Sequence, residues 1–363
     1  MPRSILVQVG ARPYRVLIDS IESWRSAPPE ELEAFRERRA VLVTDRHVAA
    51  HWLPAGLSLL EGMGLHPSVV ELPPGESTKQ MSSLTQLYDA FLAAGLRRDG
   101  LVIALGGGVI GDLAGCAAAT WMRGVSFLQV PTTLLAMADA SVGGKVGIDY
   151  GGAKNLIGAF HQPVLVLAAP ETLSTLPDEE LANGLAEVVK AAMIADGELY
   201  HLLETRDVPI WRREPVVLEK LLQRSIQVKA RIVTADEREQ GERRKLNLGH
   251  TIGHALEAAT GFKTYRHGEA VAIGLIAACR LSQMLGLCGA SVLESVERLL
   301  ERHRLPIRAS GLEWERIEPW LHLDKKAGEE GWTFVLTAGI GDVTVRPRVP
   351  EGLVREATEY VLA

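Results

Sequence analysis

The sequence has few cysteines, no excess of basic charge and no long apolar run. Its three cysteines, Cys116, Cys279 and Cys288, are odd in number and include no CxxC pair. This excludes a disulfide framework and predicts reduced core thiols in a cytoplasmic protein. No run of about eighteen residues is apolar without interruption by charge, Gly or Pro, so we expect no membrane span. The N-terminus alternates like a strand and lacks a long apolar segment, which argues against a signal peptide.

The balance of charged residues argues against one class of binding partner, nucleic acid. The chain has 39 basic and 45 acidic residues and a formal net charge of -6. A nucleic-acid-binding protein normally carries a basic excess, so this balance predicts no such partner. With 47% hydrophobic and 23% charged residues over 363 positions, the composition is that of a globular protein large enough for two domains.

The first half of the chain alternates apolar strands with helical stretches such as residues 83–94. This order predicts a mostly parallel sheet with helices on both faces. We expect its strands at 4–9, 14–18, 40–44, 68–72, 101–105, 126–130 and 164–168. After residue 170 the apolar residues recur at helical spacing. We expect helices at 178–195, 216–234, 248–259, 269–285 and 292–303, and extended segments only at 333–336 and 342–345. The sequence therefore predicts an α/β nucleotide-binding domain over 1–170 and a mostly α-helical domain over 171–363.

A glycine turn follows the expected strand at 101–105. Gly106, Gly108 and Gly111 satisfy GxGxxG, a pattern that brings backbone close to a phosphate at a helix N-terminus. By itself the pattern is weak, because a tight strand-to-helix turn has the same glycines. The acidic residue usual about twenty positions later is missing, and the acid at a strand end is Asp45, upstream. We therefore predict a nucleotide site without the standard dinucleotide-fold order.

Polar residues also follow other expected strands. Thr132 and Thr133 come directly after the strand at 126–130, with Lys145 and the Lys154-Asn155 pair further on. Ligands of open α/β sheets bind beyond the carboxyl ends of the strands. Several such ends together predict a cleft for a nucleotide and a phosphate.

Three histidines and one glutamate in the second half are candidate metal ligands. His250 and His254 stand four residues apart and share a helical face, and His267 and Glu187 complete the set. HTIGH lacks the glutamate of HExxH, which excludes a zincin protease. Catalytic zinc commonly takes three protein ligands, so four candidates compete for three places, and spacing alone favours His250 with His254. A lone histidine is usually structural, but a pair with a third nearby reverses that expectation.

Two charged features flank the histidines. Glu187 and Lys190 lie three residues apart on an apolar helix, so the pair is expected to face a cleft, although a surface ion pair has the same spacing. The run of residues 236–245 is nearly all charged and is either a solvated loop or a source of phosphate-binding arginines.

At this point the chain resembles the 3-dehydroquinate synthase family over nearly its full length. The resemblance rests on motifs that occur in the family's order: PGESTK, GGGVIGDLAG, WMRG, VPTTLLAMADASVGGKVGID, KNLIG, LAEVVK, LNLGHTIGHALE, HGEAVAIG and LDKK. It implies an NAD-binding α/β domain, a helical domain, an active site between them, one divalent metal (Zn²⁺ or Co²⁺) and a homodimer.

The resemblance also implies a reaction, the second step of the shikimate pathway. The substrate is the sugar phosphate 3-deoxy-D-arabino-heptulosonate 7-phosphate. Its C5 alcohol is oxidised transiently by NAD⁺, phosphate leaves by β-elimination, hydride returns, and ring opening and aldol closure give 3-dehydroquinate. NAD⁺ is regenerated in each turnover, so the net reaction is that of a phosphate-releasing lyase.

The family's site residues carry over onto this sequence position by position. Glu187, His250 and His267 match the metal ligands, and His254 matches a substrate-side histidine. Arg123 matches an arginine that reaches the phosphate across the dimer interface, and Asp139 matches another residue of the active-site cleft. The substrate-pocket matches are Lys145, Asn155, Lys190, Lys229, Arg243, Asn247 and one or both of Lys325 and Lys326. The NAD-side matches, with the glycine turn, are Asp45, Glu76, Lys79, Gly106, Gly107, Gly108, Gly111, Asp112, Thr132, Thr133, Lys145 and Lys154.

Three other functions compete with this interpretation. A sister sugar phosphate cyclase, such as a 2-deoxy-scyllo-inosose or valiolone-type synthase, would share fold, NAD and metal but change pocket residues. A glycerol-type metal-dependent dehydrogenase would accumulate NADH and would not need so many phosphate-facing lysines and arginines. A non-catalytic NAD-binding regulator would not need the intact ligand set.

Overall fold

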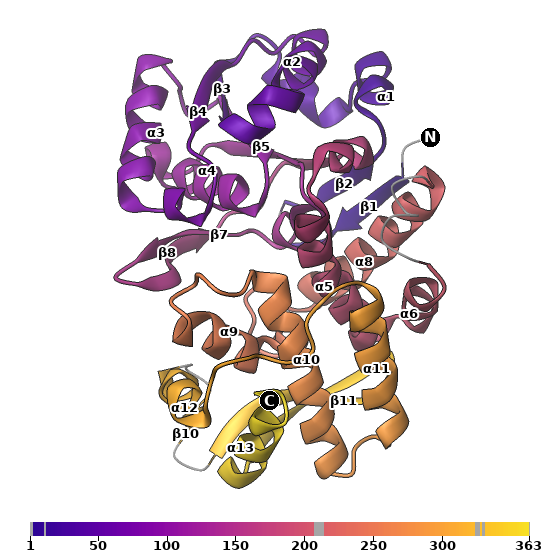
Figure 1. Ribbon diagram of the computed structural model, residues 1–363. Coiled ribbons are helices and arrows are strands. Elements are labelled where there is room, and N and C mark those ends of the chain that lie inside the picture. The colour runs from indigo at the N-terminus through magenta and orange to yellow at the C-terminus, as the bar shows by residue number, and fades with distance from the viewer. Residues whose placement is uncertain (1–2, 11, 207–213, 324–326, 329–330, 363) are drawn as a thin grey trace. The chain divides into compact units, whose positions relative to one another are not determined.

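The computed structural model describes residues 3–10, 12–206, 214–323, 327–328 and 331–362 (Figure 1). Contacts divide the chain into two compact units. Unit 1 comprises Met1–Pro177 and Leu218–Arg238, and unit 2 comprises Asp178–Val217 and Glu239–Ala363. The segment Leu218–Arg238 therefore packs with unit 1, although it follows the domain boundary predicted at residue 170.

One seven-stranded sheet forms the centre of unit 1, in the order β1-β2-β9-β6-β5-β3-β4. Its strands are β1 (Arg3–Val7), β2 (Tyr14–Ile18), β3 (Ala40–Asp45), β4 (Ser68–Leu72), β5 (Leu101–Gly106), β6 (Ser126–Pro131) and β9 (Leu165–Ala168). Only the β1–β2 hairpin is antiparallel, which confirms the predicted mostly parallel sheet. The chain runs from β3 out to β4 and then crosses to β5 on the other side. The topological switch point, where such sheets bind ligands, therefore lies between β3 and β5.

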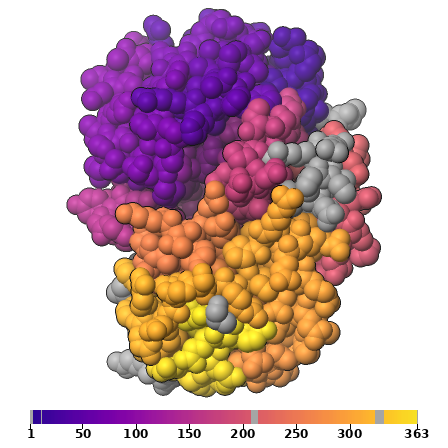
Figure 2. All heavy atoms as spheres, in the orientation of Figure 1, coloured from indigo at the N-terminus to yellow at the C-terminus, as the bar shows by residue number. Residues whose placement is uncertain are grey.

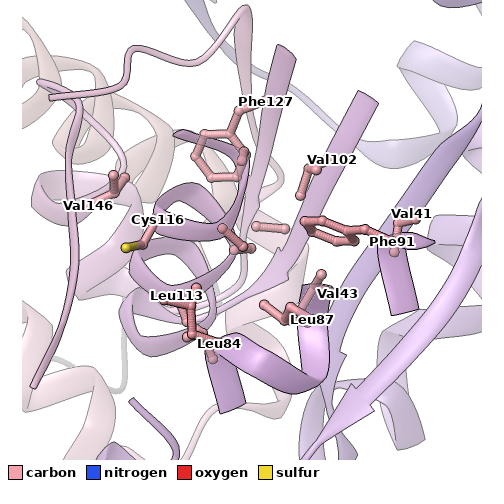
Figure 3. Packing of buried hydrophobic residues seen from close by; sticks show 14 of the residues in the cluster. Val41, Val43, Leu84, Leu87, Phe91, Val102, Leu113, Cys116, Phe127 and Val146 are labelled. Carbon is pink, nitrogen blue, oxygen red and sulfur yellow. The ribbon is translucent and has the colours of Figure 1, made fainter. Parts of the chain in front are cut away.

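The central strands β3, β5, β6 and β9 are buried on both faces because each face packs under helices. On β3, Val41 and Val43 point to one core cluster, whereas Ala40 and Leu42 point to the other. Figure 3 shows the first cluster, where Phe91 of α3 lies among these valines. The helices of this unit are α1 (Ile21–Ser26), α2 (Arg46–Gly62), α3 (Met81–Ala93) and α4 (Gly108–Thr120), with the short turns η1 (Glu30–Phe35), η2 (Glu76–Thr78), η3 (Trp121–Arg123), η4 (Ala136–Ala140) and η5 (Pro170–Thr175). In Figure 2 the N-terminal part of the chain, coloured indigo to purple, forms one closely packed body of atoms.

A hairpin of β7 (Lys145–Tyr150) and β8 (Ala153–Phe160) was not predicted from the sequence. Its glycines hide the strand pattern but are needed, since a Cβ at Gly158 would lie 2.2 Å from the Val146 carbonyl oxygen. Val146 and Ile148 of β7 are buried in the cluster of Figure 3, against α4. The polar residues predicted for the cleft around Lys145 and Asn155 thus stand on a β-hairpin fixed to the core.

Unit 2 is mostly helical, as predicted. Its helices are α5 (Asp178–Ala195), α6 (Gly197–Glu204), α9 (His250–Ala259), α10 (His267–Met284), α11 (Ala290–Arg302), α12 (Trp314–Leu323) and α13 (Glu351–Glu359), with the short helix η6 (Glu242–Asn247). Helix α8 (Pro215–Ala235) spans the division between the units. The two extended segments predicted near the end lie in β11 (Gly331–Gly339) and β12 (Asp342–Val349), and the short strand β10 (Ala327–Gly328), which was not predicted, completes their antiparallel sheet. None of the helices in the described part of the chain is both long and apolar enough to span a bilayer.

Candidate active site

Helix α5 carries Glu187 into the interior of unit 2. The helix starts with Asp178, Glu179 and Glu180 in its first turn, where carboxylates favour the positive end of the helix dipole. Small and apolar side chains then bury the helix on every side from Leu181 onward. Glu187 is 1% exposed, and its Oε2 forms an ion pair with the equally buried Lys190. The pair expected to face a cleft is therefore enclosed, where an unpartnered carboxylate would be very costly.

The close approach of α9 and α10 brings two histidines to this carboxylate. Gly249 precedes α9 in the left-handed region at φ 76°. A Cβ at Gly274 of α10 would lie only 1.9 Å from the Gly249 carbonyl oxygen. Glycine at these positions lets the two helices touch backbone to backbone, which sets His250 and His267, the first residues of α9 and α10, near each other.

The three predicted ligands form a cluster with metal-like spacing. Glu187 Oε1 lies 3.5 Å from His250 Nε2 and 3.3 Å from His267 Nε2. Ligands at about 2.0–2.1 Å around a tetrahedral zinc are about 3.4 Å apart, so both separations suit one such ion. His250 Nδ1 lies 3.1 Å from the Leu248 carbonyl oxygen, which favours the tautomer that leaves Nε2 free to coordinate.

The carboxylate itself shows that these residues fit a cation. Lys190 and both histidines lie within ion-pair range of Glu187, yet neither of its buried oxygens accepts a well-oriented hydrogen bond from the described residues. Buried carboxylate lone pairs normally have a donor or a metal. One carboxylate and two imidazoles are a ligand set that suits zinc or cobalt.

The protonation states of the cluster follow from burial and from mutual contacts. Burial by itself raises the pKa of Glu187, but Lys190 and His267 outweigh it and lower that pKa to about 2. Burial lowers the pKa of His250 well below its usual value, and Lys190 adds to the effect. Burial also disfavours charge on His267, but the nearby carboxylates of Glu187 and Glu257 raise its pKa to about 9. Without a metal, His267 is therefore protonated at neutral pH, whereas His250 is neutral and Glu187 is ionised.

His254 stands beside this cluster with its side chain exposed. Its ring centroid lies 5.1 Å from that of His250 and 6.1 Å from that of His267. It belongs instead to a second group with Glu257 and His267 that has metal-ligand spacing. The i, i+4 spacing alone favours His250 and His254 as a pair of ligands. The position of Glu187 on another helix distinguishes them, because Glu187 groups with His250 and His267 and not with His254.

Unit 1 places the predicted glycine turn at the carboxyl end of β5, where α4 begins. A Cβ at Gly106 would lie 2.7 Å from Ile110 Cβ, and one at Gly111 would lie 2.9 Å from Gln129 Oε1. Packing therefore requires glycine at Gly106, whereas at Gly111 the end of the Gln129 side chain could shift to make room. Gly108 has room for a side chain, since its nearest neighbour would be Ala140 at 3.6 Å. At Gly108, the first residue of α4, the fold leaves space in which a phosphate can approach the helix N-terminus.

Several predicted NAD-side and pocket residues of unit 1 contact one another. Lys79 is buried and donates to Asp112 Oδ2 at 2.5 Å and to Asn155 Oδ1. Burial lowers the pKa of Lys79, but Asp112 and Glu76 more than offset this and raise it. Lys154 lies 3.9 Å from Glu76.

Lys229 and Asp139 form a second ion pair in unit 1, at 2.7 Å. Lys229 also donates to the Asp139 carbonyl oxygen at 2.6 Å. The sequence placed Lys229 after the predicted domain boundary, but its helix segment packs with unit 1. A lysine and an acid from distant parts of the sequence are thus held together.

The remaining predicted residues of unit 1 are less clustered. Asp45 accepts hydrogen bonds from the backbone of His47 and Val48 and so caps α2. Thr133 Oγ1 accepts from the Ala136 backbone N–H, while the buried Thr132 hydroxyl has no hydrogen-bond partner among the described residues. Lys145 is exposed at the start of β7.

Arg123 lies on the short helix η3 and is exposed. It has φ 68°, and the preceding Met122 has φ 49°, so two consecutive non-glycine residues occupy the left-handed region. Such strain persists where surrounding structure holds it and is concentrated at functional sites.

Residues of unit 2 complete the predicted set. Arg243 is buried on η6, and Asn247 at the end of η6 donates to Glu239 Oε1 at 2.6 Å. Lys325 and Lys326 lie outside the described residues. Glu239 was missed because it stands in the charged run 236–245, where one acid cannot be told from the next.

Two further residues at the cluster were missed, Glu257 and Asn183. Glu257 Oε2 lies 3.4 Å from His267 Nδ1. Asn183 Oδ1 accepts from the Gly268 backbone N–H at 2.6 Å. Glu257 is the last residue of LNLGHTIGHALE and is 1% exposed; an acid in an apolar motif is the signal that could have found it.

Comparison with known proteins agrees with this geometry. Residues 69–183 match the family model described as 3-dehydroquinate synthase N-terminal, and residues 184–327 match 3-dehydroquinate synthase C-terminal. A curated 3-dehydroquinate synthase of Symbiobacterium thermophilum is 45% identical over 324 residues, which cover 89% of this chain and 90% of that protein.

Solved structures of related enzymes share the fold. A 2-epi-5-epi-valiolone synthase from Streptomyces hygroscopicus, with NAD⁺ and Zn²⁺ bound, matches at TM-score 0.88 and 28% identity over 99% of this chain and 98% of its own. A 2-deoxy-scyllo-inosose synthase complexed with carbaglucose-6-phosphate, NAD⁺ and Co²⁺ matches at TM-score 0.87 and 25% identity, over 99% and 100% of the two chains.

A mostly parallel sheet with a glycine turn, together with a helical unit that holds a buried carboxylate and two imidazoles, defines the fold class of the sugar phosphate cyclases. Within that class, the matches to both family models and the identity to curated relatives all point to one family. The chain belongs to the 3-dehydroquinate synthase family.

Proposed function

We propose that this chain is a phosphate-releasing lyase that converts 3-deoxy-D-arabino-heptulosonate 7-phosphate to 3-dehydroquinate with catalytic NAD⁺ and one divalent metal. The observation that carries the proposal is the Glu187–His250–His267 cluster, with tetrahedral spacing and an unsatisfied carboxylate, in a chain of this family. The solved relatives with NAD⁺ and Zn²⁺ or Co²⁺ support the same pair of cofactors.

Glu187, His250 and His267 would hold the metal, and the switch point of unit 1 would hold NAD⁺. When bound, the metal supplies Lewis-acid polarisation of an alcohol oxygen and NAD⁺ supplies an acceptor for its hydride. His250 is suited to its role because burial keeps its pKa low and its ring neutral. Glu187 is almost fully buried, and this strengthens its electrostatic interactions.

The buried lysines suit a substrate with a carboxylate and a phosphate. Lys190 and Lys229 are both nearly inaccessible, and each is held by an acid, Glu187 and Asp139 respectively. An ion pair fixes the position of an ammonium before the substrate arrives, so less side-chain freedom is lost on binding. We assign Lys145, Asn155, Arg243, Asn247 and His254 to the same substrate, together with Lys325 and Lys326.

For NAD⁺, we assign the glycine turn and the acids and threonines at the strand ends. Gly108 offers an approachable backbone at the start of α4, and this suits the pyrophosphate. Lys79 holds Asp112 in place. Asp45, Glu76, Thr132, Thr133 and Lys154 complete this assignment.

We further propose a homodimer in which Arg123 acts on the partner's substrate, and a cytoplasmic location. The strained, exposed backbone at Arg123 supports a functional role for this turn. The three free cysteines support a reducing compartment.

The direct test is to incubate the purified protein with the heptulosonate phosphate, NAD⁺ and Zn²⁺ and to follow phosphate and NADH together. We expect phosphate to appear with no net NADH. NADH that accumulates with turnover would instead indicate a dehydrogenase, and absence of phosphate would refute the proposed lyase.

The sister cyclases are tested in parallel with their own sugar phosphates. The fold is shared at TM-scores of 0.88 and 0.87, so fold alone does not choose among them. The higher identity to curated 3-dehydroquinate synthases favours the heptulosonate substrate. Turnover of a sister enzyme's sugar phosphate, without turnover of the heptulosonate phosphate, would instead indicate a sister activity.

A further inference from the structure

Glu257, in the last part of α9, is a buried acid to which the proposed ligand set gives no role. Its side chain is 2% exposed, and its Oε2 lies 3.4 Å from Nδ1 of His267. The other ring nitrogen of His267, Nε2, lies 3.3 Å from Glu187 Oε1. The imidazole is therefore enclosed between two buried carboxylates, one facing each nitrogen.

This arrangement assigns different roles to the two carboxylates. A neutral imidazole has one N–H donor and one lone pair. If Nε2 binds the metal beside Glu187, Nδ1 must carry the hydrogen, and Glu257 is the acceptor within reach. A carboxylate in this position fixes the tautomer and the ring orientation and increases the basicity of the ligand.

We propose that Glu257 is a positioning residue of the metal centre, which orients His267 through its Nδ1–H without binding the metal itself. The inference rests on the proposed metal site of Glu187, His250 and His267. It adds a residue from the far end of α9 to a centre whose ligands come from α5 and from the first residues of α9 and α10.

The backbone beside His267 is fixed by a contact that does not involve Glu257, so only the imidazole ring is left free to rotate. Asn183 Oδ1 accepts from the Gly268 N–H at 2.6 Å, so α5 fixes the first turn of α10. A Cβ at position 268 would lie 2.0 Å from the Asn183 carbonyl oxygen, so this contact admits no side chain there. With the backbone fixed from α5, a contact to Nδ1 controls only the rotation of the imidazole and its tautomer.

The competing role for Glu257 is direct ligation. His254, Glu257 and His267 also have donor atoms within 4.8 Å of one another. A second ion there, with the first ion on Nε2, would require His267 to lose both ring hydrogens and bridge two metals. Metal stoichiometry separates this arrangement from the proposal, because it requires two ions per chain.

The test compares Glu257→Gln and Glu257→Leu with wild type and with Glu294→Gln. Glu294 is a matched control because it is an exposed acid of α11 whose ion pair is with Arg298. Zn²⁺ affinity is measured by chelator competition, stoichiometry by elemental analysis, and ligand geometry by the visible absorption of the Co²⁺-loaded protein.

We expect one ion per chain in every variant and unchanged affinity in Glu294→Gln. Glu257→Leu should lose about 10- to 100-fold in Zn²⁺ affinity and shift the Co²⁺ spectrum. Glu257→Gln keeps an acceptor oxygen and should lose less; it decides the question if the leucine variant fails to fold.

Wild-type affinity and spectrum in Glu257→Gln and in a folded Glu257→Leu would overturn the inference. Two ions in wild type and one in the Glu257 variants would also overturn it, since Glu257 would then be a ligand. Failure of the proposed function has a different signature: wild type would bind no metal, or His267→Ala would bind it as tightly as wild type.

Discussion

Replacing Gly274 with alanine tests whether the contact between α9 and α10 builds the metal cluster. The added Cβ would lie 1.9 Å from the Gly249 carbonyl oxygen, whereas real Cβ contacts are essentially never under 3.0 Å, so the backbones must separate by 3.0 − 1.9 = 1.1 Å. His250 follows Gly249 directly and would move with it. Metal sites tolerate about 0.2 Å in ligand distances, so a shift of this size should disrupt the centre.

The expected change in the free energy of unfolding is opposite in sign to the change that helix propensity alone would produce. In the interior of a helix, Gly→Ala alone stabilises by about 1 kcal/mol. Overpacking against backbone costs about 1–3 kcal/mol or more, so the free energy of unfolding should fall. Zn²⁺ affinity should fall about tenfold or more, as it does when support for a ligand is lost.

The assays are urea unfolding of the metal-free protein and Zn²⁺ titration by chelator competition. Gly352→Ala is the matched control, because Gly352 lies in α13 with nothing within 4 Å of its added Cβ. This control should be unchanged or slightly more stable and should bind Zn²⁺ normally. A Gly274→Ala protein with the stability and Zn²⁺ affinity of the control would refute the reasoning.

Three further predictions concern charge and assembly. Zn²⁺ binding at pH 7 should release close to one proton, because the pKa of His267 is raised to about 9 in the metal-free cluster. The Zn²⁺ affinity should therefore increase as pH rises toward 9. Titration calorimetry in buffers of different ionisation enthalpy measures the released proton, and binding without proton release would contradict the prediction. Lys190→Met should destabilise the metal-free protein by up to about 3–5 kcal/mol, because it removes one of the two cations, Lys190 and protonated His267, that lie beside the buried Glu187. Saturating Zn²⁺ should recover part of the loss in thermal unfolding, and equal losses with and without Zn²⁺ would contradict this. If Arg123 acts across a dimer, mixing inactive Arg123→Ala and Lys190→Ala proteins should restore some phosphate release, and a mixture as inactive as its components would argue against it.

Local patterns in the sequence were sufficient to predict most of the fold. Buried strands such as residues 101–105 are short apolar runs bounded by glycine, and α5 was predicted with the bounds that the structure has. The β7–β8 hairpin was missed because its glycines, needed for close backbone contact, remove the alternation that marks a strand. Lys229 could not be assigned to unit 1, because its helix returns to that unit through contacts that are not local in sequence.

The metal cluster shows the same limit at the level of side chains. Spacing identifies His250 and His254 as neighbours on one helix face, but it cannot say which of them faces Glu187, since that depends on how α5 packs. Family resemblance supplied the choice of His250, and the distance to Glu187 agrees with it. Glu257 was missed because its closeness to His267 depends on the fold, and in the sequence it is marked only as an acid in an apolar motif.

Deuterium at C5 of the heptulosonate phosphate gives the most direct test of the central claim, that the chain oxidises and re-reduces one alcohol carbon while phosphate is released. The account predicts that 3-dehydroquinate retains the deuterium at the carbon derived from C5, with one phosphate released per product and no accumulating NADH. Product whose deuterium has exchanged with solvent, or deuterium recovered in free NADH, would contradict it.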